Sequence, residues 1–497
     1  MKKISISQLS QQCSVQFGTS GVRGRVEELT DEVCWIYATA FLLHLKSQGI
    51  THTGMEVGVA GDYRYSTNRI MLAVADAIAC QELKAVNYGK IPSPAIALLG
   101  LNKAIPTIMV TGSHIPDDRN GIKFNKPDGE ILKVDEESIV EIGLTIPEGK
   151  FDKDGLLLTC PKLGEVNDDA RVLYIDRFLD FFSKDCLQGK KIGLYEHSSV
   201  SRECIKEIMT SLGAEVLSLG YSDKFVSVDT EAIRPEDIVL AKEWSDKYGV
   251  DSIISTDGDG DRPLVSDEHG NWLRGDVAAV LCAQYLKLEA VVTPVSSNSA
   301  VEKSHVFEKV IRTRIGSPFV ISGMQSLVNK YLRVGGYEAN GGFLQQTELT
   351  LSGRTLSALP TRDAVIVQLC ILMMAQDKEC TISELVADLP SRYTKSDRIK
   401  NFPTEMSQQL LQNMMSASND ENLKNIDILF HDVAGKSVTI DSTDGIRIMF
   451  ENEDVIHLRP SGNAPELRCY NESATVERAE ILNMRCMTIL ESWKNND

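Results

Sequence analysis

The chain has 497 residues, of which 42% are hydrophobic and 25% charged, and its formal net charge is −18. This length exceeds what one hydrophobic core supports and favours three or four domains. The negative charge argues against nucleic acid or an anionic membrane as a partner, because either would need a basic face. A small anionic substrate stays compatible, since a local pocket can be positive on an acidic protein.

The cysteines and the apolar runs indicate where such a protein works. Eleven cysteines are scattered without a C-x-x-C pair, which predicts reduced thiols and a cytoplasmic protein. The N-terminal stretch 1–13 lacks the apolar core of a secretory signal. The longest apolar run, 364–375, is too short to span a bilayer and predicts a buried helix.

Short apolar runs alternate with longer helix-like segments through most of the chain. We expect strands at 55–62, 106–112, 190–197 and 250–258, and helices at 31–48 and 66–82. This alternation predicts α/β layers whose strands lead into functional loops. A loop-rich stretch at 144–165 and a linker-like stretch at 376–405 are expected between domains, followed by an antiparallel meander at 437–461 and a last helix at 473–494.

The first loop with chemical character is FGTSGVRG at 17–24. Its glycines allow backbone amides to approach an anion, and Arg23 adds a positive charge. The stretch is neither a Walker A sequence nor a G-x-G-x-x-G fingerprint. A glycine-rich turn without a ligand is the plainer alternative.

A second loop, VTGSHIPDDRNGIKF at 110–124, follows a predicted strand and exposes Ser113 beside His114. A serine hydroxyl can act as a nucleophile or group carrier where a base or metal assists it. The loop lacks the G-x-S-x-G elbow of an α/β-hydrolase. By itself, a Ser–His pair in a turn is also compatible with ordinary turn capping.

A third loop, TDGDGDRP at 256–263, carries three carboxylates at alternate positions, Asp257, Asp259 and Asp261. Such an arrangement points oxygens at one hard cation, so Mg²⁺ is the predicted ligand. With Glu268 at the twelfth position the spacing approaches that of an EF-hand, but Arg262 stands where the turn needs glycine. The preceding residues also predict a strand rather than a helix, and a solvated acidic turn is the remaining alternative.

The fourth loop, LRPSGNAPELRCY at 458–470, gathers guanidinium, hydroxyl and amide donors. We predict that it binds a phosphate group, which Arg side chains grip bidentately, through Arg459, Ser461, Gly462, Asn463 and Arg468. A structural turn with two surface arginines is the alternative. A cation site, a hydroxyl group carrier and anion-binding turns together indicate phosphoryl transfer, in which positioning and charge neutralisation supply the catalysis.

These four motifs, in this order, resemble the α-D-phosphohexomutase family, which includes phosphomannomutases, phosphoglucomutases and phosphoglucosamine mutases. The resemblance covers almost the whole chain and implies an α/β fold with four domains around a central cleft. Three of them would be related α/β domains with mixed sheets, and a smaller C-terminal domain would be α+β. The expected domains are 1–160 with the serine loop, 161–270 with the metal loop, 271–390 with the sugar loop and 391–497 with the phosphate loop.

The resemblance implies an isomerase that moves a phosphoryl group reversibly between C6 and C1 of a hexose. A phosphoserine at Ser113 would donate the group, and a bisphosphorylated sugar would form and turn over. Mg²⁺ would be held by Asp257, Asp259, Asp261 and a phosphate oxygen on Ser113, and a hexose 1,6-bisphosphate would activate the enzyme.

Four further residues match family positions that keep cationic or proton-transferring groups: Arg23, His114, Lys123 and Arg262. We expect Lys123 to be the general base. A lysine needs a lowered pKa for this role, and a crowded cationic site would lower it.

The sugar-recognition loop departs most from the family pattern. Its counterpart YEANGGFL, 337–344, keeps Glu338 and Gly341, whereas Asn340 replaces a serine and Gly342 a histidine. We expect Glu338, Asn340 and Gly341 to bind the sugar. ANGGFL followed by LPTRDA resembles a phosphomannomutase branch, which favours mannose phosphates.

Other interpretations stay open from the sequence. The substrate could be a glucose or glucosamine phosphate, as in phosphoglucomutases and phosphoglucosamine mutases. The chain could also be a catalytically silent sugar-phosphate-binding relative or a Mg²⁺ phosphatase. We expect sugar phosphates as partners, neither nucleic acid nor a membrane, and a monomer or homodimer.

Overall fold

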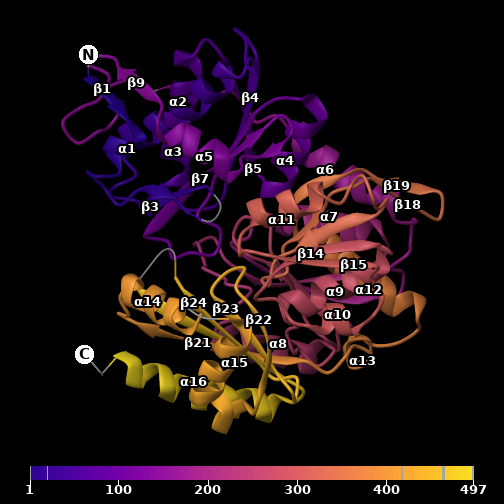
Figure 1. The fold of residues 1–497 in the computed structure, drawn as a ribbon. Coiled ribbons are helices and arrows are strands. Elements are labelled where there is room, and N and C mark those ends of the chain that lie inside the picture. Colours follow the sequence, from indigo (N-terminus) through magenta and orange to yellow (C-terminus); the bar gives the residue numbers. More distant parts are fainter. Residues whose placement is uncertain (1, 19–20, 160, 416–417, 462–464, 495–497) are drawn as a thin grey trace. The chain divides into compact units, whose positions relative to one another are not determined.

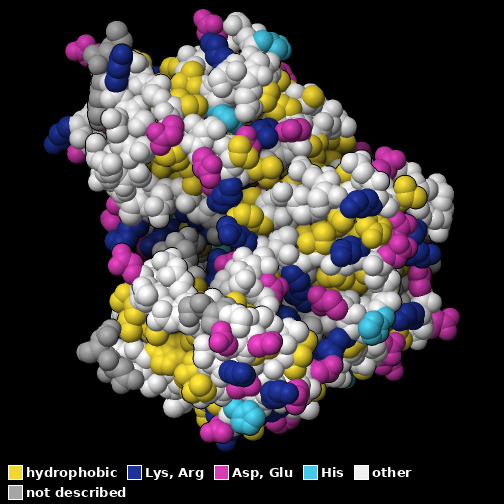
Figure 2. All heavy atoms as spheres, viewed as in Figure 1, with side chains coloured by type: hydrophobic (Ala, Val, Ile, Leu, Met, Phe, Trp, Pro, Cys, Tyr) yellow, Lys and Arg dark blue, Asp and Glu magenta, His cyan; other side chains and the backbone are white. Residues whose placement is uncertain are grey.

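The computed structural model describes residues 2–18, 21–159, 161–415, 418–461 and 465–494 (Figure 1). The chain forms two compact units, one of residues 1–291 and 316–385, the other of residues 292–315 and 386–497. Among the described helices, none is long and apolar enough to cross a bilayer. Acidic and basic side chains are intermixed over much of the face in Figure 2.

The first sheet of the larger unit contains the serine loop. Its strand order is β2-β3-β7-β6-β4-β5, with β8 paired to β7. The strands are β2 (Gln16–Phe17), β3 (Val22–Arg25), β4 (Glu56–Gly61), β5 (Lys84–Lys90), β6 (Thr107–Val110), β7 (Arg119–Lys126) and β8 (Gly129–Glu130). Because β4 pairs parallel with β5 and β6 while β7 runs antiparallel, the sheet is mixed.

Helices cover this sheet with apolar side chains. They are α2 (Asp31–Ser47), α3 (Thr67–Cys80), α4 (Ser93–Lys103) and α5 (Lys133–Val140), which confirms the helices expected at 31–48 and 66–82. Thr30 caps α2 by accepting from the backbone N–H of Val33, and Trp35 and Phe41 lie in the core. A two-stranded sheet of β1 (Lys2–Ser5) and β9 (Gly143–Ile146), with α1 (Ile6–Leu9), completes this region.

The second sheet contains the aspartate loop and has the order β11-β10-β12-β13. Its strands are β10 (Lys191–His197), β11 (Glu215–Tyr221), β12 (Ser252–Thr256) and β13 (Pro263–Val265), and its helices are α6 (Asp169–Phe181), α7 (Arg202–Ser211) and α8 (Pro235–Tyr248). β10 pairs parallel with β11 and β12, and β13 runs antiparallel to β12. The expected strand before TDGDGDRP is confirmed, since β12 ends at Thr256.

The rest of the larger unit carries the sugar loop. Its elements are α9 (Gly275–Tyr285), α11 (Ser317–Gln325), β16 (Val334–Tyr337), β17 (Phe343–Gln345), β18 (Leu349–Leu351), β19 (Arg354–Leu356), β20 (Leu359–Asp363), α12 (Ala364–Asp377) and α13 (Ile382–Ala387). β17 pairs antiparallel with both β16 and β20. The apolar run at 364–375 forms α12 and is buried throughout, as expected. The boundary between the two units falls inside β14 (Ala290–Pro294).

The smaller unit has a five-stranded antiparallel sheet with the order β21-β25-β24-β23-β22. Its elements are α10 (Ala300–Lys303), β15 (Lys309–Thr313), β21 (Tyr393–Lys400), α14 (Thr404–Met414), α15 (Asn419–Ala434), β22 (Ser437–Asp441), β23 (Ile446–Phe450), β24 (Val455–Pro460), β25 (Glu466–Ser473) and α16 (Val476–Lys494). The expected meander and last helix are confirmed. The linker expected at 376–405 is wrong in part, because this stretch includes α13 and the edge strand β21, which pairs with β25.

A buried carboxylate joins residues 292–315 to the rest of the smaller unit. Glu472 on β25 accepts hydrogen bonds from the backbone N–H and the hydroxyl of Ser299. It also pairs with Arg392, whose Nε lies 2.5 Å from its Oε1. A buried charge needs such partners, so this network ties Ser299 to the C-terminal sheet.

Candidate active site

The aspartate loop begins where β12 ends and turns back on itself. The Asp257 Oδ1 atom accepts from the backbone N–H groups of Asp261 and Arg262, both at 3.2 Å. Gly260 has φ +76°, and a Cβ there would lie 1.8 Å from the Ser201 Oγ atom. A side chain at this position is therefore excluded, and the turn aims its carboxylates inward.

The three carboxylates form a buried cluster. One oxygen of each of Asp257, Asp259 and Asp261 lies within 4.8 Å of the others, and all three residues are at most 2% exposed. The Oδ1 atoms of Asp259 and Asp261 are buried without a hydrogen-bond partner. Buried carboxylate oxygens without a hydrogen bond are costly, so this cluster fits a hard divalent cation. The EF-hand alternative fails here too, because Glu268 instead accepts from the backbone N–H of Ser383 at 3.2 Å.

Ser113 lies directly against this cluster although it is 144 residues away from Asp257 in sequence. Its hydroxyl donates to the Asp257 Oδ2 atom at 2.5 Å, and the His114 Nδ1 atom lies 3.3 Å from the same hydroxyl. Ser113 is 1% exposed and has φ +54°, a backbone conformation that is uncommon outside glycine. Its backbone N–H donates to the Thr111 Oγ1 atom at 2.8 Å. The turn thus holds one hydroxyl in a fixed direction.

Arg64 is the main support of the serine turn. Its guanidinium donates to four backbone carbonyl groups at 2.5–3.0 Å, those of Ser113, Ile115, Pro116 and Arg119. Asp62 accepts from its Nε atom at 3.2 Å and from the Thr111 hydroxyl at 2.8 Å. A Cβ on Gly112 would lie 2.6 Å from the Arg64 Cζ atom, so glycine is needed for this close approach.

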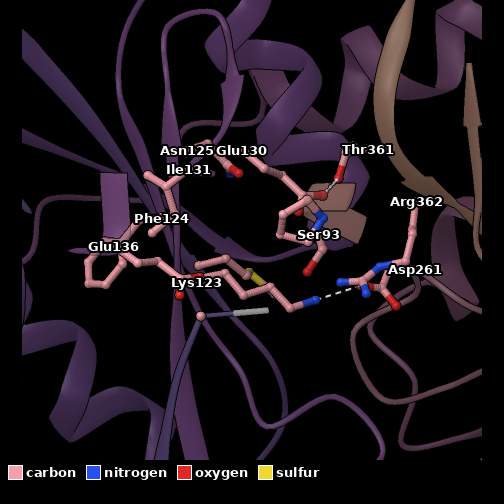
Figure 3. Close-up of a pocket in the computed structure, with 13 residues that line it drawn as sticks. Ser93, Lys123, Phe124, Asn125, Glu130, Ile131, Glu136, Asp261, Thr361 and Arg362 are labelled. Carbon is pink, nitrogen blue, oxygen red and sulfur yellow. Dashed lines mark hydrogen bonds and ion pairs between the residues drawn. The ribbon is translucent and has the colours of Figure 1, made fainter. Parts of the chain in front are cut away.

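Cationic side chains surround the carboxylates. The Lys123 Nζ atom, on β7, lies 2.6 Å from oxygens of both Asp259 and Asp261. The Arg362 guanidinium, at the end of β20, pairs with Asp261 at 2.9 Å. Arg262 is more loosely placed, with its Nε atom 3.8 Å from Asp261. Figure 3 shows Lys123 and Arg362 both pointing toward Asp261.

The electrostatics differ from expectation at Lys123. Burial would lower the pKa of Lys123, but the charges of Asp259 and Asp261 outweigh it and raise this pKa. The expected lowering of the Lys123 pKa is therefore wrong while the amine pairs with both carboxylates. Burial and the charges of Asp259 and Asp261 also raise the pKa of Asp257 well above its usual value, a repulsion that a bound cation would relieve.

Two other predicted groups have pKa values lowered by their surroundings. Burial, followed by the charges of Arg262 and Arg23, lowers the pKa of His114, so this imidazole is neutral. Burial and the charges of Arg262 and Arg362 lower the pKa of Arg23 to about 10. Since arginine resists deprotonation, Arg23 still carries its charge near pH 7.

The sugar loop follows β16. Glu338 and Asn340 are buried, and the Glu338 Oε2 atom accepts from the Arg362 Nη1 atom at 2.8 Å. Gly341 has φ +87°, and its N–H donates to the Glu338 carbonyl at 2.9 Å. A Cβ on Gly342 would lie 2.6 Å from the Arg362 Cδ atom. Arg362 therefore fills the space beside Gly342 and links the sugar loop to the aspartate cluster.

A narrow cavity of about 20 Å³ borders this arrangement, room for about one water molecule. It is lined by Lys123, Asp261 and Arg362 together with Ser93, Glu130 and Thr361, among others (Figure 3). The Ser93 hydroxyl donates to the Asp259 Oδ2 atom at 2.6 Å. Glu130 accepts from the hydroxyls of Thr361 and Ser317, at 2.5 and 2.9 Å. The walls offer mostly polar and charged groups.

The fourth predicted loop belongs to the smaller unit. Arg459 and Arg468 are directly paired across β24 and β25, so their side chains share one face of the sheet. The Arg459 Nε atom lies 2.9 Å from the Asp444 Oδ1 atom, and the Ser461 N–H donates to the Glu466 carbonyl at 2.8 Å. The predicted residues Gly462 and Asn463 lie outside the described residues.

Several supporting residues were not assigned from the sequence: Asp62, Arg64, Ser93, Glu130, Thr361 and Arg362. Arg362 stands in LPTRDA, the stretch used only as a marker of a family branch. Arg64 lies two residues after the expected strand at 55–62, and this position near a strand's end is a general hint of a functional loop that does not single out Arg64.

Comparison with known proteins defines the class of this protein. Three family models match: phosphoglucomutase/phosphomannomutase α/β/α domain I at residues 14–148, domain II at 173–270 and domain III at 274–393. The expected fold class is thereby confirmed, with three α/β/α domains followed by a smaller C-terminal domain of sheet and helices.

Curated relatives narrow the class further. The chain is 43% identical over 465 residues to a phosphomannomutase of Salmonella muenchen, covering 94% of this chain and 93% of that protein. It is 39% identical over 478 residues to a phosphomannomutase of Sinorhizobium fredii (strain NBRC 101917 / NGR234), covering 96% and 99%. The chain therefore belongs to the phosphoglucomutase/phosphomannomutase family, as its resemblance to the α-D-phosphohexomutases predicted. It is a phosphohexomutase-type enzyme of a phosphomannomutase-like branch.

Solved structures share the fold. A putative phosphomannomutase from Thermus thermophilus matches with a TM-score of 0.74 and 18% identity, covering 96% of this chain and 99% of that one. An Aspergillus fumigatus N-acetylphosphoglucosamine mutase, in complex with GlcNAc-6P and magnesium, matches with a TM-score of 0.57 and 13% identity, covering 98% of each chain. At these identities the likeness shows the fold alone.

Proposed function

We propose that this enzyme interconverts hexose 6-phosphate and hexose 1-phosphate, with mannose phosphates as the preferred substrates. Phosphorylated Ser113 would donate its phosphoryl group to the sugar, and the bisphosphorylated sugar would turn over and return the other phosphate to Ser113. The observation that carries this proposal is the 2.5 Å hydrogen bond from the buried Ser113 hydroxyl to Asp257, within the carboxylate cluster.

The charged and neutral residues around Ser113 would have different roles in the transfer. Arg23, Arg262 and Lys123 would neutralise a phosphoryl group on Ser113. Lys123 would also transfer the proton of the attacking sugar hydroxyl, once a substrate or cation draws Asp259 and Asp261 away from it. Neutral His114 would hold the Ser113 oxygen through its Nδ1 atom, which lies within reach.

We infer that the metal is Mg²⁺ and that Asp257, Asp259, Asp261 and an oxygen on Ser113 hold it. Their all-oxygen donor set supports this choice, as do the buried Oδ1 atoms of Asp259 and Asp261, which accept no hydrogen bond. Bound Mg²⁺ would neutralise charge on the transferring phosphoryl group. The magnesium in the fungal neighbour's complex is consistent with it.

Glu338, Asn340 and Gly341 would recognise the sugar hydroxyls, with Arg362 setting the direction of the Glu338 carboxylate. Arg459, Ser461, Gly462, Asn463 and Arg468 would grip the phosphate that does not react. Arg459 and Arg468 are directly paired across β24 and β25, so two guanidinium groups share one face of the sheet, which supports this role. A hexose 1,6-bisphosphate would activate the enzyme by phosphorylating Ser113.

We place the enzyme in the cytoplasm, because no disulfide bond joins any of the ten described cysteines. Sugar phosphates are its proposed partners.

The test of the mechanism is Ser113→Ala. Loss of the hydroxyl removes the group carrier, so turnover should fall to background while circular dichroism and the melting temperature stay close to those of the parent. Mass mapping of the parent protein should find phosphate on Ser113 after incubation with hexose 1,6-bisphosphate. Full mutase activity in Ser113→Ala would exclude a phosphoserine mechanism.

The sugar is tested separately with mannose, glucose and glucosamine 1-phosphates, compared by kcat/KM in the presence of the bisphosphate activator. We expect the mannose compound to lead. Tight binding without isomerisation would favour a catalytically silent relative, to which the altered sugar loop points. Phosphate release at the rate of turnover would favour a phosphatase.

A further inference from the structure

A second, larger cavity lies beside α3 and the end of β5. Its volume is about 350 Å³, and it shares no lining residue with the cavity beside Asp261. The lining residues are Asn68, Met71, Leu72, Asn87, Gly89, Lys90, Leu163 and Val166. Four of these side chains are large and apolar, and one, Lys90, is ionisable.

The amine of Lys90 has weak compensation for its charge. Its Nζ atom lies 3.7 Å from the Met71 Sδ atom, and a thioether is a poor acceptor. Within the described part of the chain, Lys90 makes no ion pair. Asp62, at the end of neighbouring β4, is the charged group that acts on it, but the oxygens of Asp62 accept from Arg64 and Thr111.

The balance of these effects increases the neutral fraction of the Lys90 amine. Burial lowers the pKa of Lys90 to about 8, although the charge of Asp62 acts in the opposite direction. At pH 7.5 roughly a quarter of such amines are neutral, compared with about one in a thousand for an ordinary lysine. Only the neutral form has the lone pair that a nucleophile needs.

We propose that Lys90 is a site of N-acylation by activated short-chain acyl donors, namely acyl phosphates or thioesters. The neutral Nζ atom attacks the acyl carbon, and a C–N bond forms. The bond from that carbon to phosphate oxygen or thiol sulfur breaks, and the leaving group takes the electron pair. The extra proton on nitrogen passes to solvent. The product is an uncharged amide, whose apolar chain suits the walls formed by Met71, Leu72, Leu163 and Val166.

The position of Lys90 connects this cavity with the aspartate loop. Two residues further on, Pro92 precedes Ser93, whose N–H and hydroxyl donate to the carbonyl and the carboxylate of Asp259 at 2.9 and 2.6 Å. Acylation also removes the positive charge that faces Asp62. A modification of Lys90 therefore lies close to Ser93, which supports the aspartate loop, and to Asp62, which supports the serine loop.

The experiment compares two lysines of one strand in the full-length native protein. The probe is acetyl phosphate, and peptide mass mapping gives the rate of acetylation at Lys90 and at Lys84. Lys84 is exposed and pairs with Glu56 at 2.7 Å. At pH 7.5 we expect Lys90 to react roughly tenfold faster or more, because its neutral fraction is larger. Its rate should level off above about pH 8, and the ratio should fall to near one in urea. Equal rates in the native protein would overturn the proposal.

Two variants test whether the cavity causes this reactivity. Asn68→Asp places a carboxylate on the cavity wall with almost no change of shape. This negative charge favours the protonated amine, so the reaction of Lys90 at pH 7.5 should slow and its rate should level off at a higher pH. Met71→Leu keeps the wall apolar and should preserve the fast reaction. An unchanged rate in Asn68→Asp would mean that the surroundings of the amine do not set its reactivity, contrary to the proposal.

Discussion

At the scale of single residues, the contact between Ser113 and Asp257 joins the proposed phosphoryl carrier to the proposed metal site. Asp257→Asn keeps the size of the side chain but removes a charge from the carboxylate cluster. We expect kcat to fall at least ~100-fold, because a weaker metal site leaves less positive charge to neutralise the transferring phosphoryl group. Mg²⁺ affinity, measured by titration calorimetry, should fall in parallel.

The matched control is Asp267→Asn in the turn after β13. Asp267 accepts from the backbone N–H groups of His269 and Asn271, both within 2.9 Å, so its loss should lower the melting temperature. It should leave Mg²⁺ affinity unchanged. If Asp257→Asn bound Mg²⁺ as the parent does, the assignment of Asp257 as a metal ligand would be wrong.

Arg64 tests positioning at the same scale. Lysine at this position keeps the charge but cannot reach four carbonyl groups at once, so the Ser113 turn should loosen. We expect Arg64→Lys to lower kcat about tenfold or more and to change KM little, because a small displacement of a reacting group costs this much. Stability should fall by about 1–3 kcal/mol as buried carbonyls lose their donor.

Arg69→Lys is the control for Arg64→Lys. Arg69 lies on α3, which packs on the sheet that contains the serine loop, and it donates to Asp31 at 2.6 Å and to the Leu29 carbonyl at 2.7 Å. Its loss should lower the melting temperature with kcat preserved. An equal fall of kcat in both variants would mean that Arg64 acts on stability alone.

At the scale of elements, the turn between β16 and β17 depends on its second glycine. Gly342→Ala would bring a Cβ within 2.6 Å of the Arg362 Cδ atom and push this side chain from Glu338 and Asp261. We expect kcat/KM to fall about 10-fold or more, in line with the loss of a charge-assisted hydrogen bond. Gly143→Ala, where a Cβ would meet nothing within 4 Å, should keep its kcat/KM. Parent-like kinetics in Gly342→Ala would show that Arg362 has room to move.

Elements also differ in how far the sequence predicts them. β12 is buried along its whole length and α12 over residues 364–375, so hydrophobic runs predict them well. β21 is an edge strand with mostly exposed side chains, and it exists because all eight of its residues pair with β25. Such a strand is stabilised by a partner far along the chain, so its own residues gave the pattern of a linker.

At the scale of the whole molecule, the motifs predicted the loops but not their supports. The sequence predicts the serine and aspartate loops because alternate carboxylates, and a serine beside a histidine in a turn, have a chemical meaning in themselves. Arg64 and Arg362 act through contacts that folding creates, with carbonyl groups and with two carboxylates. A single arginine in a loop has no signature, so only the fold assigns these two.

Each of the two compact units contains a buried histidine that contacts a backbone carbonyl next to a predicted functional loop. The His197 Nε2 atom lies 2.8 Å from the carbonyl of Thr256, just before Asp257, and the His457 Nε2 atom lies 2.7 Å from the carbonyl of Asp444. Asp444 in turn pairs with Arg459 of the phosphate loop. Burial lowers the pKa of each histidine to about 4, from 6.5.

Lowered histidine pKa values make the stability of both units depend on pH. The unfolded chain binds protons on these two imidazoles below about pH 6.5, whereas the folded chain does so only below about pH 4. The free energy of unfolding is therefore highest above pH 6.5 and falls as the pH drops from 6.5 to 4. Each shift corresponds to about 3 kcal/mol of unfolding free energy.

We therefore expect His197→Gln to reduce the loss of stability at acid pH in the larger unit, and His457→Gln to do so in the smaller unit. Glutamine keeps an N–H donor but does not titrate. Scanning calorimetry between pH 4 and 8 should show the transition of one unit losing less stability than in the parent, while the other transition follows the parent curve. The carboxylates contribute equally to parent and variants, so the difference between the two curves isolates the histidine. Parallel curves in both variants would mean that the folded protein protonates these imidazoles near their ordinary pKa.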